Sequence, residues 1–203
     1  MKNNPVVKER LWWRIRGFKA MDSRFNGDLS KYVSSFSPKI KISILEIGFG
    51  EGKALLELRS LFRDKNMSLY GVNVKPEGDM KKRSDFLRNA KRFGIKVSKS
   101  NLPTPFFYDA GEGLHFKSNS IDIIVSQVAF HYIYDKAKLI EEIWRVLRPN
   151  GKAFLHIDGS KNFENYPDFL KNNSETPRFI IYNKEGKMIK LSTIIKNLNK
   201  KGY

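Results

Sequence analysis

Three glycines at alternating positions, Gly48, Gly50 and Gly52, directly follow Glu46 in the segment LEIGFGEG. Glycine lets the backbone turn tightly and approach a ligand closely, and a helix that starts there offers free N–H groups. A dinucleotide fingerprint would need its third glycine at position 53, where this chain has Lys53, and no Gly-Lys-Ser/Thr ending completes a phosphate-binding P-loop. The segment therefore predicts a ligand-binding turn that belongs to neither of these two classes.

Alternating strands and helices are predicted around this turn. Apolar, β-rich runs predict strands at 42–47, 68–74, 106–109, 121–127 and 152–158. Apolar residues spaced three and four apart predict helices at 53–62, 79–94 and 136–148, the second ending at Gly94 and the third at Pro149-Asn150-Gly151. Strands that alternate with helices imply right-handed crossovers, so we expect an α/β fold with a doubly wound, mainly parallel sheet and helices on both faces.

Three segments together resemble one enzyme family. They are LEIGFGEG, FYDAGEGLHFKSNSIDIIVSQVAFHYI and LIEEIWRVLRPNGKAFLHID, which occur in this order within roughly residues 42–158. Their order and spacing resemble the class I S-adenosylmethionine (SAM)-dependent methyltransferases, in particular the type 11-like members with a Rossmann-like fold. The resemblance implies a transferase that uses SAM as its cofactor.

The resemblance also implies roles for individual residues. In this family the acid at Glu46 helps to hold the cationic amino end of SAM, and Asp109 with Ala110 meets the adenine. One departure is Asn73, which ends the second strand where relatives have an acid that binds both ribose hydroxyls. Because a neutral amide pairs more weakly than a carboxylate, we expect SAM binding to be weaker by about 1 kcal/mol. The predicted cofactor residues are Glu46, Gly48, Phe49, Gly50, Gly52, Asn73, Asp109, Ala110 and Gln127.

Methyl transfer is an in-line displacement, so such an enzyme mainly has to align the nucleophile and exclude water. The segment after the fourth strand faces the methyl group in the family, and here it supplies Gln127, His131 and Tyr132. His131 is the candidate general base, because its ordinary pKa lies near 6.5. The alternative is that His131 only lines the pocket, as Tyr132 is predicted to do.

Several chemistries are excluded or disfavoured by composition. The chain has no cysteine, which excludes disulfides, zinc–thiolate sites and a cysteine nucleophile. SQVAFHY stands where an Asn/Asp-Pro-Pro-aromatic motif would indicate methylation of exocyclic amino groups. No His, Asp and Glu cluster has metal-ligand spacing, so no metal is expected. No signal-peptide core or membrane-length apolar stretch is present, so we expect a cytoplasmic location and no membrane association.

Positive charge is concentrated outside the predicted cofactor region. The formal net charge is +17, and residues 81–100 alone carry eight Lys or Arg against one Asp. Such a cluster can bind a polyanion such as RNA by releasing counterions from phosphates. It can equally be the solvated face of a helix in a Lys-rich chain. The residues of this candidate surface are Lys81, Lys82, Arg83, Arg88, Lys91 and Arg92.

The two ends of the chain flank the predicted SAM-binding domain at 41–160. Residues 1–40 form a basic, aromatic segment that either covers the substrate, with Trp12 and Trp13 lining the site, or packs as a helix on the core. Residues 161–203 are predicted as a hairpin and a helix of the same domain. The chain ends at NLNKKGY, before the two strands that complete the sheet in many relatives. Three alternatives stay open: a naturally short protein, a sheet rearranged so that RFIIYN and KMIKL take the place of these strands, and a truncated chain. An exposed sheet edge would suit a homodimer or a partner chain.

Three functions are compatible with these features. The first is a SAM-dependent methyltransferase that acts on an O, N or C nucleophile of a small molecule. The second is an RNA-directed methyltransferase, which salt-sensitive RNA binding would distinguish. The third is a noncatalytic SAM-fold binding module, for which Asn73 is the main argument and improved SAM binding by Asn73→Asp the test.

Overall fold

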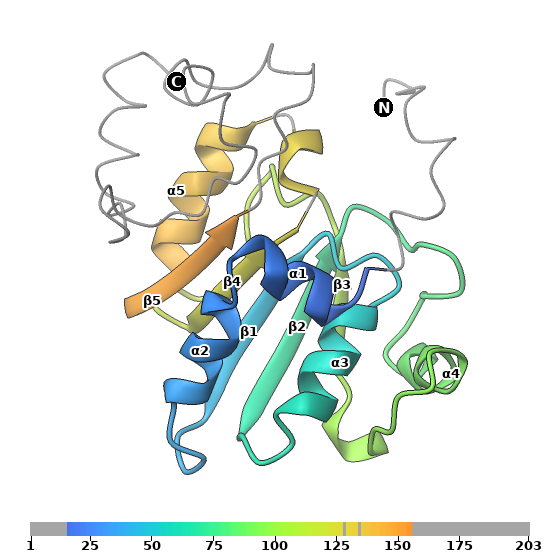
Figure 1. Ribbon diagram of the computed structural model, residues 1–203. Helices are drawn as coiled ribbons and strands as arrows, with labels where there is room; N and C mark the ends of the chain where they lie inside the picture. Colours follow the sequence, from blue (N-terminus) through green and yellow to red (C-terminus); the bar gives the residue numbers. More distant parts are fainter. Residues whose placement is uncertain (1–15, 128, 134, 156–203) are drawn as a thin grey trace.

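The computed structural model describes residues 16–127, 129–133 and 135–155 of the chain. Within them, five parallel strands form one sheet in the order β3-β2-β1-β4-β5 (Figure 1). The strands are β1 (Ile42–Ile47), β2 (Met67–Asn73), β3 (Thr104–Phe107), β4 (Ile121–Ser126) and β5 (Leu147–Leu155). The strand order reverses between β1 and β4, so the predicted doubly wound α/β fold is confirmed, with its topological switch point there.

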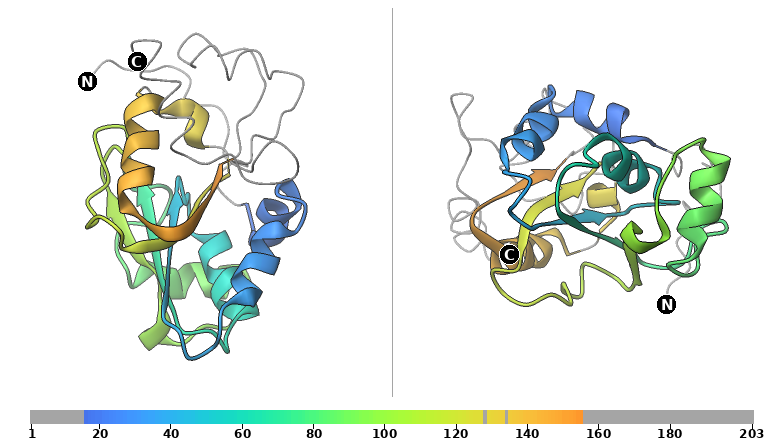
Figure 2. Two further views of the ribbon diagram at one scale, coloured as in Figure 1. Left: turned by 90° about the vertical axis from the view of Figure 1, so that its left-hand side faces the viewer. Right: turned by 90° about the horizontal axis from the view of Figure 1, so that it is seen from below.

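Helices cover both faces of the sheet. On one face lie α1 (Phe18–Arg24), α2 (Asp28–Ser35) and α3 (Lys53–Leu61), and on the other lies α5 (Lys136–Val146), as Figure 2 shows. The helix α4 (Asp85–Arg92) packs beside α3. Two short 3-10 helices, η3 (Lys99–Asn101) and η4 (Ala129–Tyr132), complete the described elements.

The core is divided into two clusters by the sheet. Every residue of β1 and β4 is buried, as expected for central strands covered on both faces. Because successive side chains alternate between faces, Leu45 and Ile47 join the cluster under α5, whereas Ile42 and Ile44 join the cluster under α1, α2 and α3. The carboxyl ends of β1 and β4 are therefore held rigidly on both sides.

The described part of the N-terminal segment packs against the sheet. Phe18 and Phe25 are buried in the same cluster as α3, and Tyr32 and Phe36 pack against that cluster. For these aromatics the structure favours the packing alternative over a cover for the substrate. Trp12 and Trp13, like the predicted C-terminal hairpin and helix, lie outside the described residues, so the division of the chain into three segments stays a prediction.

Several predicted boundaries were wrong. The third strand begins at Thr104 instead of 106, because an edge strand such as β3 tolerates Pro105. The helix predicted at 79–94 begins only at Asp85, whose carboxylate accepts hydrogen bonds from the Lys81 and Lys82 amides and so closes a turn before the helix. The third helix ends at Val146, and the fifth strand follows at once.

None of the described helices has both the length and the apolar character that a membrane span requires.

Candidate cofactor site

The glycine turn joins β1 to α3 at the switch point of the sheet. Gly48, Gly50 and Gly52 have φ angles of 78°, 56° and 81°, in the left-handed region that glycine tolerates best. The Gly48 N–H donates to the Val72 carbonyl of β2 at 2.7 Å. A Cβ atom on Gly48 would lie 2.0 Å from the Ala129 Cβ, so η4 sits directly against the turn. The sequence pattern thus reflects a real steric requirement.

Glu46 is a buried acid on the central strand. Only 4% of its surface is exposed, and no described residue forms a hydrogen bond with its Oε2 atom. Burial raises the pKa of the Glu46 carboxyl from 4.5 to about 8. A buried carboxylate without a partner is costly, and a cationic or hydrogen-donating ligand group would remove that cost. Glu46 is therefore suited to a positively charged part of a ligand.

Gln127 presents a second unpaired polar atom next to β4. It directly follows the strand, is 5% exposed, and its Nε2 finds no acceptor among the described residues. Glu46 and Val125 are register partners, and Ser126 Oγ donates to the Ile47 carbonyl at 3.2 Å, so the ends of β1 and β4 lie side by side. An unpaired acceptor and an unpaired donor are thus buried at the same edge of the sheet.

Asn73 supports the glycine turn. Its Oδ1 accepts from the Gly50 N–H at 3.2 Å, and its Nδ2 donates to the Gly50 carbonyl at 3.0 Å. The side chain is 5% exposed. Both ends of the amide are engaged by one residue of the turn, which a carboxylate could not achieve because it has no donor. The departure from the family's acid therefore has a structural role at this position.

We predict that Asn73→Asp lowers both stability and cofactor affinity. The aspartate loses the hydrogen bond to the Gly50 carbonyl and places a negative charge beside that oxygen, so a loss of about 2 kcal/mol in unfolding free energy is expected. Urea denaturation and titration with S-adenosylhomocysteine measure the two effects. Tighter binding by the variant would contradict this role and favour the ribose contact inferred from the resemblance.

The ring of Phe49 is buried in the core and does not lie on the side of the glycine turn where a ligand would bind. The ring is 3% exposed and packs against Phe86 and Phe107 at centroid distances of 6.1 Å each. It also lies directly over Gly71 of β2, where a Cβ atom would come within 2.5 Å of it. The predicted cofactor contact of Phe49 is thus limited to its backbone, because its side chain belongs to the core.

Asp109 and Ala110 follow β3 at the carboxyl edge of the sheet. Asp109 is exposed, and its Oδ1 accepts from the Gly111 N–H at 2.8 Å, whereas Ala110 is buried. The Tyr108 N–H donates to the Asn73 carbonyl at 2.8 Å, which holds this segment next to the end of β2. The structure therefore brings Asp109 and Ala110 to the same edge as Glu46, Asn73 and Gln127.

The predicted substrate-side residues are only partly described. His131 and Tyr132 belong to η4, whose first residue contacts Gly48, so their backbone lies beside the glycine turn. The Tyr132 side chain is exposed, and the His131 side chain is not among those described. Trp12 and Trp13 lie outside the described residues.

Two functional neighbours of the turn were not predicted. Glu51 is buried and forms an ion pair with Arg92 of α4. Asn89 is fully buried, and its Nδ2 donates to the Glu51 carbonyl at 3.0 Å. Both contacts tie α4 to the glycine turn. A sequence signal for Asn89 was its place on the helix face that also carries Phe86 and Ala90, whereas nothing local indicated the contacts of Glu51.

No group of three or more His, Asp or Glu side chains within the described ranges is placed to hold a metal ion.

The comparison with known families decides which family the chain belongs to. The family model described as a methyltransferase domain matches residues 45–155, from the start of the glycine segment to the end of β5. The chain belongs to the class I SAM-dependent methyltransferases. SAM is the cofactor of this family.

Relatives of this methyltransferase share about 30% of the matched residues. A protein of Rickettsia felis named as the ubiquinone/menaquinone biosynthesis C-methyltransferase UbiE is 31% identical over 138 residues, covering 66% of this chain and 51% of the relative. The uncharacterized methyltransferase YdaC of Bacillus subtilis is 29% identical over 113 residues, covering 56% and 54%. The chain thus spans about half the length of the curated relatives it matches.

Solved structures share the fold at low sequence identity. A putative SAM-dependent methyltransferase from Methanococcus maripaludis matches with a TM-score of 0.52 and 16% identity, over 91% of this chain and 78% of that one. The CurJ carbon methyltransferase matches with a TM-score of 0.53 and 16% identity, over 71% and 36%.

The residues of the methyltransferase site fit its cofactor. The unpaired Glu46 Oε2 would meet the cationic amino end, and the glycine turn would let the backbone approach the ligand. Gln127 Nε2 offers a donor at the same edge. The buried Glu46 Oε2 and Gln127 Nε2, which have no partners among the described residues, are the observation that supports a fit to the amino acid part of SAM.

Proposed function

We propose that this methyltransferase binds SAM at the switch point and transfers a methyl group to a nucleophile of a small molecule. The buried Glu46 carboxyl supports this proposal most strongly, because its Oε2 has no hydrogen-bond partner among the described residues and buried acids are rarely left without one.

The chain's own residues would bind and align the reactants. Bound SAM supplies a methyl group on a positively charged sulfur. Glu46 would hold the amino end, Asp109 and Ala110 would hold the adenine, and Asn73 would keep the Gly50 backbone in place. His131 is proposed as the base that accepts a proton from a hydroxyl substrate, with Gln127 and Tyr132 lining the same side. Catalysis would then come from alignment and from exclusion of water.

Calorimetric titration with S-adenosylhomocysteine tests the proposal. We expect micromolar binding that Asp109→Ala weakens about tenfold or more and that Gly50→Arg abolishes by filling the turn. Glu112→Ala is the matched control, since Glu112 is exposed on the same loop. A folded protein that does not bind at millimolar ligand would overturn the enzyme assignment and leave the binding-module hypothesis.

The names of the relatives suggest which methyl acceptor to test first. Because the UbiE proteins are named for C-methylation in quinone biosynthesis, an electron-rich ring carbon is the first nucleophile to test. An assay for transfer of a labelled methyl group from SAM to phenolic or quinol compounds tests this nucleophile. Compounds that offer oxygen or nitrogen nucleophiles on the same ring scaffold serve as the comparison.

The cytoplasmic location and a partner chain at a sheet edge stay predictions.

An RNA substrate is the second candidate, and the exposed lysines of α4 and of the turn before it favour this substrate. Lys81, Lys82 and Lys91 are exposed, and none forms an ion pair with a carboxylate of the described residues. If RNA binds there, affinity for a single-stranded RNA should fall with salt, and charge reversal of these lysines should reduce the salt dependence by about 0.7 per lost contact. Equal binding by the variant and the parent would contradict an RNA site at these lysines, and absence of RNA binding by the parent would contradict the RNA candidate as a whole.

A further inference from the structure

The connection from β3 to β4 contains no helix. Residues 108–120 run between the two strands as a loop, and this loop carries Asp109 and Ala110. A helix would satisfy its own backbone groups, whereas a loop must find other partners to keep one geometry. The cofactor contacts assigned to this loop therefore depend on whatever holds it.

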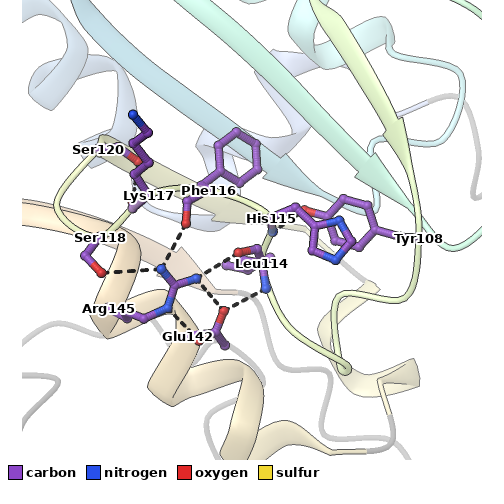
Figure 3. Close-up of polar contacts among 9 residues, drawn as sticks. All are labelled: Tyr108, Leu114, His115, Phe116, Lys117, Ser118, Ser120, Glu142 and Arg145. Atoms are coloured by element: carbon purple, nitrogen blue, oxygen red, sulfur yellow. Dashed lines mark hydrogen bonds and ion pairs between the residues drawn. The ribbon is translucent and has the colours of Figure 1, made fainter.

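Arg145 of α5 holds the far half of the loop (Figure 3). Its guanidinium donates to the Leu114 carbonyl at 2.8 Å and to the Phe116 carbonyl at 2.9 Å. It also reaches the Ser118 hydroxyl at 3.4 Å. Two further bonds, of 2.7 and 2.6 Å, join it to both carboxylate oxygens of Glu142 one turn earlier. A single side chain thus fixes three loop residues and its own ion-pair partner.

Glu142 completes this attachment. Its Oε2 accepts from the Leu114 N–H at 2.8 Å, so the pair grips both the N–H and the carbonyl of Leu114. The last carbonyls of α5 add two bonds, because Asn119 N–H donates to the Arg145 carbonyl and Ser120 N–H to the Val146 carbonyl, each at 2.9 Å. The loop is joined to α5 along most of its second half.

The turn at residues 109–113 lies between this attachment and the sheet. On the sheet side, the Tyr108 N–H donates to the Asn73 carbonyl at 2.8 Å. On the α5 side, the turn leads directly into Leu114. The His115 N–H donates to the Tyr108 hydroxyl at 3.1 Å, and the two rings stack at 4.0 Å, which closes the base of the turn. With both ends fixed, the turn presents Asp109 and Ala110 in one arrangement.

We propose that Glu142 and Arg145 are positioning residues for the cofactor, acting through Leu114 to hold the turn that presents Asp109 and Ala110 to the adenine. This inference rests on the proposed function, and it assigns to α5 a role beyond packing. The charge pair is suited to the task, because Arg145 holds the pKa of the Glu142 carboxyl below its usual value and both groups stay ionised near neutral pH. Lysine could not replace Arg145, since one ammonium cannot reach all of these acceptors.

A double-mutant cycle on S-adenosylhomocysteine binding tests the proposal. Arg145→Met is expected to weaken binding about tenfold, and Glu142→Gln, which retains an acceptor for Leu114, about threefold. If Arg145 acts through the turn, its effect should largely vanish in an Asp109→Ala background. It should persist in a Glu46→Gln background, because Glu46 meets the other end of the ligand.

Arg148→Met is the matched control. Arg148 forms an ion pair with Asp122, in which one guanidinium nitrogen donates to both carboxylate oxygens at 3.0 and 2.8 Å, and it is about as exposed as Arg145. No side-chain hydrogen bond joins it to a described residue of the loop. It should lower thermal stability and leave affinity unchanged. Amide hydrogen exchange at Gly111 and Leu114 should quicken only in the Arg145 and Glu142 variants, with or without ligand.

The outcomes separate this inference from the proposed function. Absence of ligand binding by the parent protein overturns both. Binding by the parent together with unchanged affinity in a folded Arg145→Met or Glu142→Gln variant overturns the positioning role alone. An Arg145 effect that is fully additive with Asp109→Ala also overturns it.

Discussion

Glu46→Gln is expected to stabilise the cofactor-free protein at alkaline pH and to weaken its binding of S-adenosylhomocysteine. Both effects follow from a carboxyl group that burial keeps protonated, with a pKa of about 8 in place of 4.5. Glutamine has nearly the same shape but no charge. The substitution therefore removes the cost of ionising a buried acid together with the charge that the ligand would use.

The stability effect depends on pH in a defined direction. Between the unfolded pKa of 4.5 and the folded pKa of about 8, the folded protein keeps a proton that the unfolded chain has lost. Stability must therefore fall as pH rises through this window, by about 1.4 kcal/mol per pH unit and on the order of 5 kcal/mol in all. Urea denaturation from about pH 5 to pH 9 should show this slope in the parent and lose it in the variant. A parallel pH profile in the two proteins would contradict a buried acid at position 46, and Glu112→Gln, at an exposed site, is the control.

Ligand affinity should depend on pH in the opposite direction to stability. Pairing with an ammonium group requires ionised Glu46, so ligand binding near neutral pH should release a proton from the parent and none from the variant. Affinity should rise by up to about tenfold per pH unit and level off near pH 8, where Glu46 becomes ionised in the free protein as well. At that pH the variant should bind on the order of a hundredfold more weakly. Titration in buffers of different ionisation enthalpy measures the proton release.

The strands and helices of the sheet region follow from local patterns. The run ISILEI gave β1 with its observed ends, and the apolar spacing in 136–148 predicted α5, because burial on one or both faces leaves a periodic signature. The start of α4 was missed, since Asp85 binds the amides of Lys81 and Lys82 in a turn that helix propensity does not reveal. The start of β5 was missed because Pro149, Asn150 and Gly151 are turn-forming residues, yet here they lie within a strand with a register shift.

The turn of the candidate site could be predicted from the sequence, because three closely spaced glycines indicate a backbone with positive φ angles. The role of Glu46 came from the family resemblance, and its contact with the cofactor stays a prediction. The role of Asn73 could not be predicted, because its partner Gly50 is 23 residues away and only the fold brings them together. The contacts of Arg145 and Glu142 could not be predicted either, since nothing local identifies a loop 27 to 31 residues earlier as their partner.

Gly48→Ala is expected to destabilise the protein by about 3 kcal/mol and to abolish ligand binding. Two costs combine at this position. An L-residue at a φ of 78° is strained, and the new Cβ atom would lie 2.0 Å from the Ala129 Cβ and 3.4 Å from its Cα. Relief requires the glycine turn and η4 to move apart, which displaces the backbone that the cofactor would contact. Thermal unfolding and titration with S-adenosylhomocysteine measure the two effects.

Gly27→Ala separates the two costs. Gly27 has nearly the same φ, 77°, but nothing lies within 4 Å of an added Cβ atom. It should therefore show only the conformational penalty, about 1 kcal/mol, with ligand binding unchanged. Equal losses in the two variants would mean that η4 can withdraw from the turn at little cost. A flexible η4 would also move His131 and Tyr132, so the difference between these two alanine variants measures how firmly the substrate side of the site is held.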